Sequence, residues 1–167
     1  MDPSGSRVAI RGARSNEAET LERIEAQCFE TDRMSRRSLN HHLRSKTSDV
    51  LIAELGGRVA GYAMMFYRAN ATVARLYSIA TLPEARGHGV ADALMAAVER
   101  TARRRGYTAL RLEVRSDNPA AIKLYAKRGY LEFGGYADYY ADGMSARRFE
   151  KPLNVRPVQA RSTKRAA

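Results

Sequence analysis

The pattern of hydrophobic and polar residues along the chain predicts short strands that alternate with longer helices. Apolar residues recur at a spacing of three or four positions in several segments, which predicts helices. Alternating or continuously apolar runs, bounded by glycine, proline and polar residues, predict strands. The predicted helices cover residues 16–29, 35–46, 90–105 and 119–128, and the predicted strands cover residues 8–11, 49–55, 58–67, 72–80 and 109–115, with two more between residues 130 and 151. This order of elements indicates an α/β fold.

Polar residues indicate where two of the predicted helices begin. Ser15 and Asn16 are candidate N-caps of the first helix, and Glu19 would complete a capping box with Asn16. Asn118 is the candidate N-cap of the last helix, with Pro119 at its first helical position. The last helix therefore has the more sharply defined start.

The composition indicates one folded domain. Hydrophobic residues make up 44% of the 167 residues and charged residues 28%, as in ordinary globular proteins. We assign residues 1–153 to the domain and residues 154–167 to a basic, mobile C-terminal tail. Because no apolar run approaches the roughly 20 residues that span a bilayer, and the N-terminus lacks the apolar segment of a secretory signal, we expect a cytoplasmic protein without a membrane partner.

The chain carries a strong positive charge. Its 29 basic and 18 acidic residues give a formal charge of +11, which favours anionic partners such as nucleic acid, the ribosome or a phosphate-rich cofactor. No recognisable nucleic-acid motif combines basic runs with aromatic residues. We therefore expect contact with nucleic acid only through the general charge.

The single cysteine and the paired histidines argue against a metal site. Cys28 is the only cysteine, which excludes an intrachain disulfide, and its place on the apolar side of a predicted helix indicates a buried small hydrophobe. His41 and His42 are neighbours in a predicted helix, so their side chains point about 100° apart and do not easily bind one metal ion. Surface or interface histidines are the expectation.

A glycine-bearing turn joins the predicted strand 72–80 to the predicted helix 90–105. Gly87 and Gly89 lack a Cβ atom, so an anion could approach their backbone closely. The first turn of a helix has N–H groups without intrahelical partners and a dipole that favours negative charge, so the junction is a candidate phosphate site. A tight connection without a ligand is the alternative. The spacing matches neither a Walker loop nor a dinucleotide fingerprint, which excludes those two nucleotide sites.

Two signatures occur in order around this junction. The first has Arg86, Gly89 and Ala91 spaced as Arg-x-x-Gly-x-Ala, and the second, in residues 112–130, has Leu-Glu-Val-Arg followed by Asn-x-x-Ala-x-x-Leu-Tyr and Gly-Tyr. Both resemble the GCN5-related N-acetyltransferase (GNAT) family, and the second is most similar to the RimI-type protein N-alpha-acetyltransferases. The resemblance implies the GNAT fold, an α/β fold whose mixed, mostly antiparallel sheet of about six or seven strands is flanked by about four helices.

The resemblance also implies how acetyl-coenzyme A, the acetyl donor of the family, would bind. Backbone groups at the end of the strand 72–80 would pair with the pantetheine arm, and the glycine loop with the first turn of the next helix would surround the pyrophosphate. The cofactor-binding residues that the resemblance implies are Ile79, Ala80, Thr81, Arg86, Gly87, His88, Gly89, Val90, Ala91, Asp92 and Asn118.

Glu113 and Tyr125 match the residues proposed in RimI-type enzymes as general base and general acid. An α-amine, with a pKa of about 7.7 to 8.0, and a lysine amine, with a pKa of about 10.4, are protonated at neutral pH, so a base has to remove a proton before the amine attacks the thioester. Tyr125 would protonate the departing thiolate, and the acyl group would pass directly to the amine. The alternatives are a salt-bridged strand face for Glu113 and helix packing for Tyr125.

On the acceptor side, Tyr139 and Tyr140 match a Tyr-Tyr pair near the peptide groove of RimI-type enzymes. Asp138 and Asp142 could attract a cationic amine, and a merely polar, aromatic loop is the alternative. RimI-type proteins usually carry Pro-Trp-Ser between their first two helices, whereas residues 29–35 lack that segment and the chain has no tryptophan.

We therefore expect an acetyl-CoA-dependent N-acetyltransferase. The favoured acceptor is the N-terminal α-amine of a protein or peptide, for example a ribosomal protein. Two alternatives stay open: a small amine such as a polyamine, an amino acid or a drug, and a non-catalytic acyl-CoA sensor or ribosome-associated module. A monomer and a homodimer are both compatible with the sequence.

Overall fold

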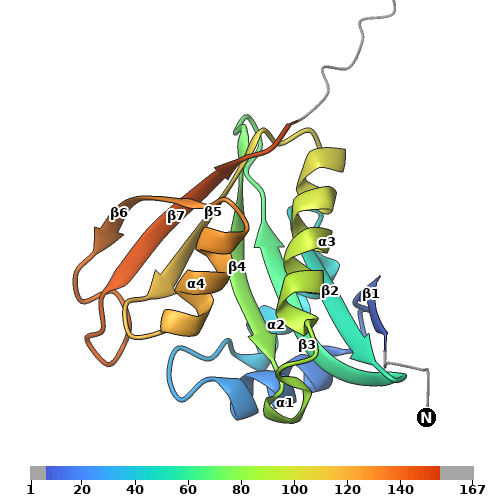
Figure 1. Ribbon diagram of the computed structural model, residues 1–167. Coiled ribbons are helices and arrows are strands. Elements are labelled where there is room, and N and C mark those ends of the chain that lie inside the picture. The colour runs from blue at the N-terminus through green and yellow to red at the C-terminus, as the bar shows by residue number, and fades with distance from the viewer. Residues whose placement is uncertain (1–6, 155–167) are drawn as a thin grey trace, which may run out of the picture.

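The computed structural model describes residues 7–154 as a seven-stranded sheet with helices on both faces (Figure 1). The strands are β1 (Val8–Gly12), β2 (Ser48–Leu55), β3 (Arg58–Phe66), β4 (Val73–Thr81), β5 (Ala109–Arg115), β6 (Leu131–Tyr136) and β7 (Ala146–Pro152). The helices are α1 (Ala18–Cys28), α2 (Arg36–Arg44), α3 (Val90–Arg104) and α4 (Pro119–Lys127), with a 3₁₀-helix at Pro83–Ala85.

The sheet is mixed and mostly antiparallel, as predicted. Its strand order is β1-β2-β3-β4-β5-β7-β6, and among the strands of the described residues only β4 and β5 run parallel to each other. Helices α3 and α4 cover one face, and α1 and α2 cover the other (Figure 1). The predicted fold is therefore confirmed.

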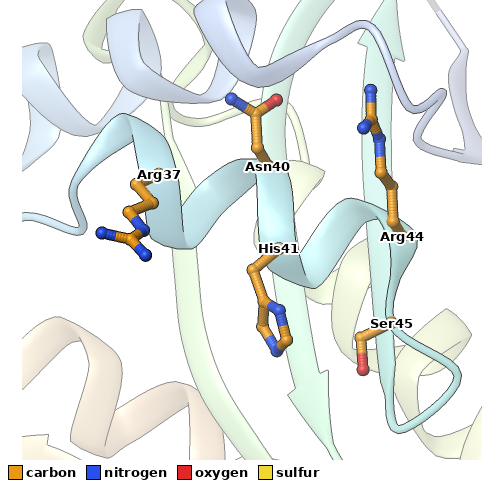
Figure 2. A pocket seen from close by; sticks show the side chains of 5 residues that line it. All are labelled: Arg37, Asn40, His41, Arg44 and Ser45. Atoms are coloured by element: carbon orange, nitrogen blue, oxygen red, sulfur yellow. The ribbon is translucent and has the colours of Figure 1, made fainter.

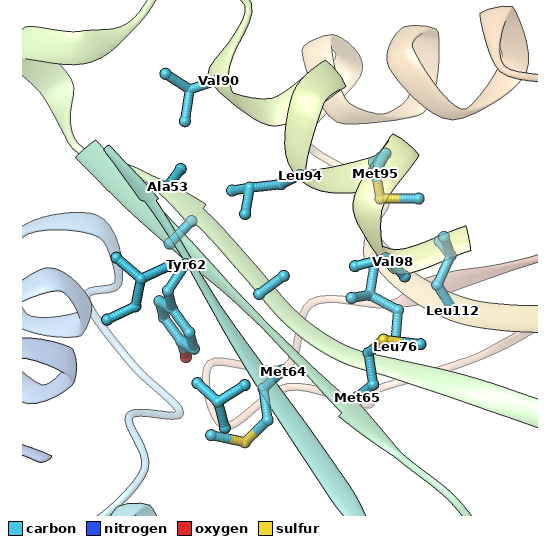
Figure 3. Packing of buried hydrophobic residues seen from close by; sticks show 14 of the residues in the cluster. Ala53, Tyr62, Met64, Met65, Leu76, Val90, Leu94, Met95, Val98 and Leu112 are labelled. Carbon is cyan, nitrogen blue, oxygen red and sulfur yellow. The ribbon is translucent and has the colours of Figure 1, made fainter. Parts of the chain in front are cut away.

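The core lies on both faces of the central strands. Figure 3 shows Met95 and Val98 of α3 beside Leu76 of β4, whereas Tyr62 and Met64 of β3 extend away from α3. All five side chains are buried. Burial on both faces explains why β3 is apolar at nearly every position and does not alternate.

The first helix does not begin where its sequence indicates. It starts at Ala18, with Glu17 in the N-cap position, so the predicted caps at Ser15 and Asn16 and the capping box with Glu19 are wrong. The reason lies in tertiary contacts. The carboxylate of Glu17 accepts hydrogen bonds from the Arg11 guanidinium and also from the Arg14 backbone N–H, at 2.8 Å, which holds residues 14–17 in a turn.

One single-residue prediction also needs correction: the Cys28 side chain is only half-buried, and its Sγ lies 3.3 Å from the carbonyl oxygen of Thr81. His42, expected at the surface or at an interface, is partly exposed, and its ring stacks on Phe66 at 4.4 Å between centroids. Burial lowers the pKa of His42, and the neighbouring His41 lowers it further. Both residues pack beside the edge of the core.

The start of α4 agrees with the sequence. Asn118 Oδ1 accepts a hydrogen bond from the backbone N–H of Ala121 at 3.2 Å, and Pro119 occupies the first helical position. The basic tail falls almost wholly outside the described residues. Within them, no helix is long and apolar enough to cross a bilayer.

A buried ion cluster joins α3, α4 and β7. Glu99 of α3 is 1% exposed, and its two carboxylate oxygens lie 2.5 Å from Arg128 and 2.5 Å from Lys151. Arg128 also pairs with Asp92 in the first turn of α3, at 2.7 Å. Because a buried carboxylate is tolerated only when it is paired, Glu99 fixes the relative position of these three elements.

We expect Glu99→Leu to lower the free energy of unfolding by about 3 kcal/mol, because it leaves the partly buried Lys151 without its anion and Arg128 with Asp92 alone. Urea titration followed by circular dichroism would measure the loss. Glu22→Leu is the matched control, since Glu22 pairs with Arg36 on the open surface of α1. Equal losses from the two substitutions would contradict a structural role for the cluster.

Candidate active site

The parallel strands β4 and β5 pair over only part of their length. Their register runs from Val73 opposite Ala109 to Leu76 opposite Leu112 and then stops. Beyond this point β4 continues to pair with β3, and β5 with β7. The edge of β4 from residue 77 to residue 81 therefore faces a gap, where its backbone groups are available to an extended ligand.

A β-bulge in β4 coincides with the end of this pairing. Met64 of β3 lies opposite Ser78, whereas the next residue, Met65, lies opposite Leu76, so Tyr77 is an extra residue in β4. A bulge bends its strand and increases the local twist. The bulge thus directs the end of β4 away from β5.

The end of β4 and the start of α3 meet at Gly61 of β3. A Cβ atom at this position would lie 2.4 Å from the carbonyl oxygen of Ala80 and 3.3 Å from Val90 Cγ1. Only glycine permits this approach. The open edge of β4 and the N-terminus of α3 therefore belong to one site.

The loop before α3 exposes backbone N–H groups. Gly87 and Gly89 have φ angles of +80° and +78°, which favour glycine, and a Cβ atom on either would contact nothing within 4 Å. Gly89 occupies the N-cap position of α3, and no side chain caps the helix there. The N–H groups of the first turn of α3 are therefore available to an anion.

Two side chains of this segment, those of His88 and Asp92, already have other partners. His88 Nδ1 lies 3.0 Å from the Arg86 carbonyl oxygen, and the carboxylate of Asp92 pairs with Arg128. Asn118, the N-cap of α4, lies beyond the end of β5. The backbone, more than the side chains, thus forms this part of the site.

Glu113 lies on the α1 and α2 face of β5 between two arginines. Its side chain is 8% exposed, and its carboxylate lies 3.2 Å from Arg75 of β4 and 3.5 Å from Arg148 of β7. Arg75 also donates a hydrogen bond to the Tyr139 hydroxyl at 2.9 Å. The sequence analysis missed both arginines. Alternation along the strand 72–80 places Arg75 on the same face as Val73 and Tyr77, but nothing in the sequence pairs it with Glu113.

Tyr125 lies on the other face of the sheet. Leu112 pairs directly with Phe149, and Tyr125 packs on Phe149 at 6.4 Å and on Tyr130 at 5.8 Å between ring centroids. Burial raises the pKa of Tyr125, and the neighbouring Tyr140 adds to this effect. Glu113 and Tyr125 therefore do not touch: they lie on opposite faces of the sheet, close to the point where β4 and β5 separate.

The loop between β6 and β7 brings the predicted acceptor tyrosines to the same region. Tyr139 and Tyr140 pack edge to face at 5.0 Å. Burial raises the pKa of Tyr140 to about 12, and the nearby Tyr139 and Glu113 add to the effect. Tyr77, which the sequence analysis did not single out, is 43% exposed on β4. Two exposed tyrosines, Tyr77 and Tyr139, and the half-buried Tyr140 thus lie close to the pair formed by Arg75 and Glu113.

The two aspartates of this loop differ in their contacts. Asp142 pairs with Arg115 at 2.6 Å and accepts a hydrogen bond from the Met144 backbone N–H, so its charge is already engaged. Asp138 is exposed and has a φ of +50°. The idea that Asp142 attracts the amine is therefore not supported.

A shallow depression on α2 lies apart from these residues. Figure 2 shows its lining side chains on the outer surface of α2 and at the turn that follows; they are Arg37, Asn40, His41, Arg44 and Ser45. None of them was predicted to bind the cofactor or the acceptor. Within residues 7–154, no group of three or more His, Cys, Asp or Glu side chains is arranged to hold a metal ion.

The sequence profile of the "Acetyltransferase (GNAT) family" matches residues 16–130, and the chain belongs to this family of acetyltransferases. Among curated relatives, an acetyltransferase of Sodalis glossinidius is 38% identical over 80 residues, which are 48% of this chain and 55% of the relative. A Bacillus subtilis protein named putative ribosomal protein bS18-alanine N-acetyltransferase is 29% identical over 138 residues, which are 82% of this chain and 89% of that protein. The first relative is thus matched over only about half of its length.

Solved structures share the fold. The ribosomal-protein-S18-alanine N-acetyltransferase of Escherichia coli has a TM-score of 0.80 at 23% identity, covering 92% of this chain and 98% of that chain. The yncA protein of Salmonella typhimurium, described with its cofactor acetyl-CoA, has a TM-score of 0.76 at 19% identity, covering 89% of this chain and 95% of that chain. At these identities the similarity shows the fold alone.

Proposed function

We propose that the protein transfers an acetyl group from acetyl-CoA to a primary amine, and that the acceptor is the N-terminal α-amine of a protein or peptide. The observation that carries the proposal is the gap between β4 and β5, which opens directly beside an uncapped helix N-terminus. An open strand edge suits an amide-containing arm, and a helix N-terminus suits a phosphate. Acetyl-CoA contains both.

In this arrangement the backbone of Ile79, Ala80 and Thr81 pairs with the pantetheine arm. The N–H groups of the loop and first turn, from Gly87 to Asp92, bind the pyrophosphate, and Arg86 and Asn118 contribute contacts beside it. Asp92 takes part through its backbone N–H, because its carboxylate would repel a phosphate and is held by Arg128. The cofactor therefore passes between the strands near Glu113 and Tyr125.

Glu113 is the proposed base. It takes a proton from the ammonium group of the acceptor, directly or through one water, and the neutral amine then attacks the thioester carbonyl carbon. Arg75 and Arg148 beside Glu113 add positive charge, which lowers the pKa of a nearby amine and so favours its reactive, neutral form. Formation of the C–N bond gives a tetrahedral intermediate.

Tyr125 is the proposed acid. The collapse of the intermediate breaks the C–S bond and releases a thiolate, which takes the phenolic proton of Tyr125. Because burial raises the pKa of Tyr125, its phenol holds that proton at neutral pH. The nitrogen loses its second proton to the Tyr125 phenolate, the amide product and coenzyme A leave, and Glu113 returns its proton to solvent.

The acceptor class is supported by the name of the Bacillus subtilis relative, which refers to N-acetylation of an alanine of ribosomal protein bS18. A ribosomal protein is therefore the first acceptor to test. A cytoplasmic location, expected from the sequence, agrees with such an acceptor and stays a prediction, as does the domain limit at residue 153. The chain's own acceptor side differs from the RimI pattern in the segment 29–35.

We expect Gly89→Ala to raise the Kd for acetyl-CoA about tenfold, because a side chain at positive φ distorts the loop whose N–H groups would bind the pyrophosphate. Isothermal titration calorimetry would measure this. Gly57→Ala is the matched control, since Gly57 has an equally positive φ of +77° in the β2–β3 turn, outside the loop that would bind the pyrophosphate. An unchanged Kd for Gly89→Ala, or no binding to the wild-type protein, would overturn the assignment of the loop.

We expect Glu113→Gln to lower kcat at neutral pH at least about a hundredfold and to leave the Kd for acetyl-CoA unchanged, because the amide cannot accept the proton. The assay follows free thiol release and confirms acetylated peptide by mass spectrometry. Glu150→Gln is the control, because Glu150 pairs with Arg111 on the neighbouring strand. Wild-type turnover of Glu113→Gln would exclude Glu113 as the base, and tight cofactor binding with no acetylated product from any amine would favour the sensor alternative.

A further inference from the structure

The arginines on β5 and β7 differ in how their charges are balanced. Three of them have carboxylates of their own: Arg111 pairs with Glu150, Arg115 with Asp117 and Asp142, and Arg147 with Glu132. Arg148 of β7 and Arg75 of the adjoining strand β4 pair only with Glu113 among the residues that the structure describes. Two guanidinium groups thus share one carboxylate at the centre of the candidate site.

The geometry leaves hydrogen-bonding capacity on both of these arginines. Arg148 lies 4.6 Å from the ring centroids of both Phe133 and Tyr136, and within residues 7–154 its buried Nε–H faces Glu113 Oε1 at 3.5 Å without forming a hydrogen bond. Arg75 donates its Nε–H to Glu113 at 3.2 Å and one Nη2–H to the Tyr139 hydroxyl. An arginine has five N–H donors, so both can bind a further anion.

The excess charge is within reach of a ligand. The side chain of Arg75 is 41% exposed, and it lies beside Tyr139, which is 40% exposed. The α1–α2 loop contains two acids, Glu30 and Asp32, and neither forms an ion pair with Arg75 or Arg148. Asp32 instead accepts a hydrogen bond from the Ala141 backbone N–H at 3.2 Å. The missing negative charge is therefore not supplied from that loop.

We infer that the acceptor supplies the missing negative charge. The preferred acceptor is a peptide with aspartate or glutamate as its first or second residue, whose side-chain carboxylate binds Arg75 and Arg148. This inference rests on the proposed function and names its substrate class. Guanidinium groups bind carboxylates in a bidentate, charge-assisted way. A carboxylate that engages Arg75 also weakens the hold of Arg75 on Glu113 and so leaves Glu113 free to take the proton of the amine.

The test compares peptides that differ only in charge. Aspartate, asparagine or lysine is placed at the first or the second position of one otherwise identical peptide, and kcat/KM is measured with saturating acetyl-CoA. We expect the aspartate peptide to exceed its isosteric asparagine peptide about tenfold at one of these positions, and the lysine peptide to be the poorest.

Arginine variants identify the groups responsible. Arg75→Gln and Arg148→Gln should each reduce the preference for aspartate over asparagine, even where they also lower the overall rate, whereas the control Arg111→Gln should keep it. The ratio of the two peptides is the readout, so a general loss of activity does not imitate the result. An unchanged ratio in both variants would overturn the assignment to these arginines.

Failure of this inference can be distinguished from failure of the proposed function. Acetylation of asparagine or lysine peptides at least as fast as aspartate peptides would overturn the inference and leave the proposed function standing. Acetyl-CoA binding without acetylation of any peptide would overturn both. Acetylation of free aspartate but of no peptide would also overturn the inference, because it would make a small amine the acceptor.

Discussion

The end of the β4–β5 pairing at Leu76 and Leu112 is the constraint on which the rest of the site depends. Parallel strands that stayed paired would use their backbone groups on each other. Here the bulge at Tyr77 bends β4 at the same place where the pairing stops, and Gly61 lets the end of β4 lie against the start of α3. An open strand edge and an uncapped helix N-terminus therefore become neighbours, which is the arrangement that a long phosphate-bearing thioester requires.

Electrostatics holds the parts of this arrangement in place. Arg128, at the end of α4, reaches both Glu99 in the middle of α3 and Asp92 in its first turn. These ion pairs thus link α3, which follows the proposed pyrophosphate-binding loop, to α4, which carries Tyr125. On the other face, Glu113 is held by Arg75 of β4 and Arg148 of β7, so the strands on both sides of β5 fix the proposed base beside the gap.

Local signals in the sequence were sufficient for much of this fold. Alternation defined β5, the Asn118 and Pro119 pair defined the start of α4, and the two signatures identified the family, which the comparisons confirm. The predictions that were wrong, and the site residues that were not predicted, depend on contacts between residues far apart in the chain. The start of α1 follows Glu17 contacts with Arg11, and the charge around Glu113 comes from Arg75 and Arg148, which lie on strands that the sequence alone does not place beside it.

Hydrogen–deuterium exchange with and without acetyl-CoA tests the central claim most directly. If the cofactor occupies the gap, amides in Ile79–Thr81 and in Gly87–Asp92 will exchange more slowly in its presence, while those of the α2 depression between Arg37 and Arg44 will not change. Protection confined to α2, or no protection at the end of β4 under saturating acetyl-CoA, would contradict the account.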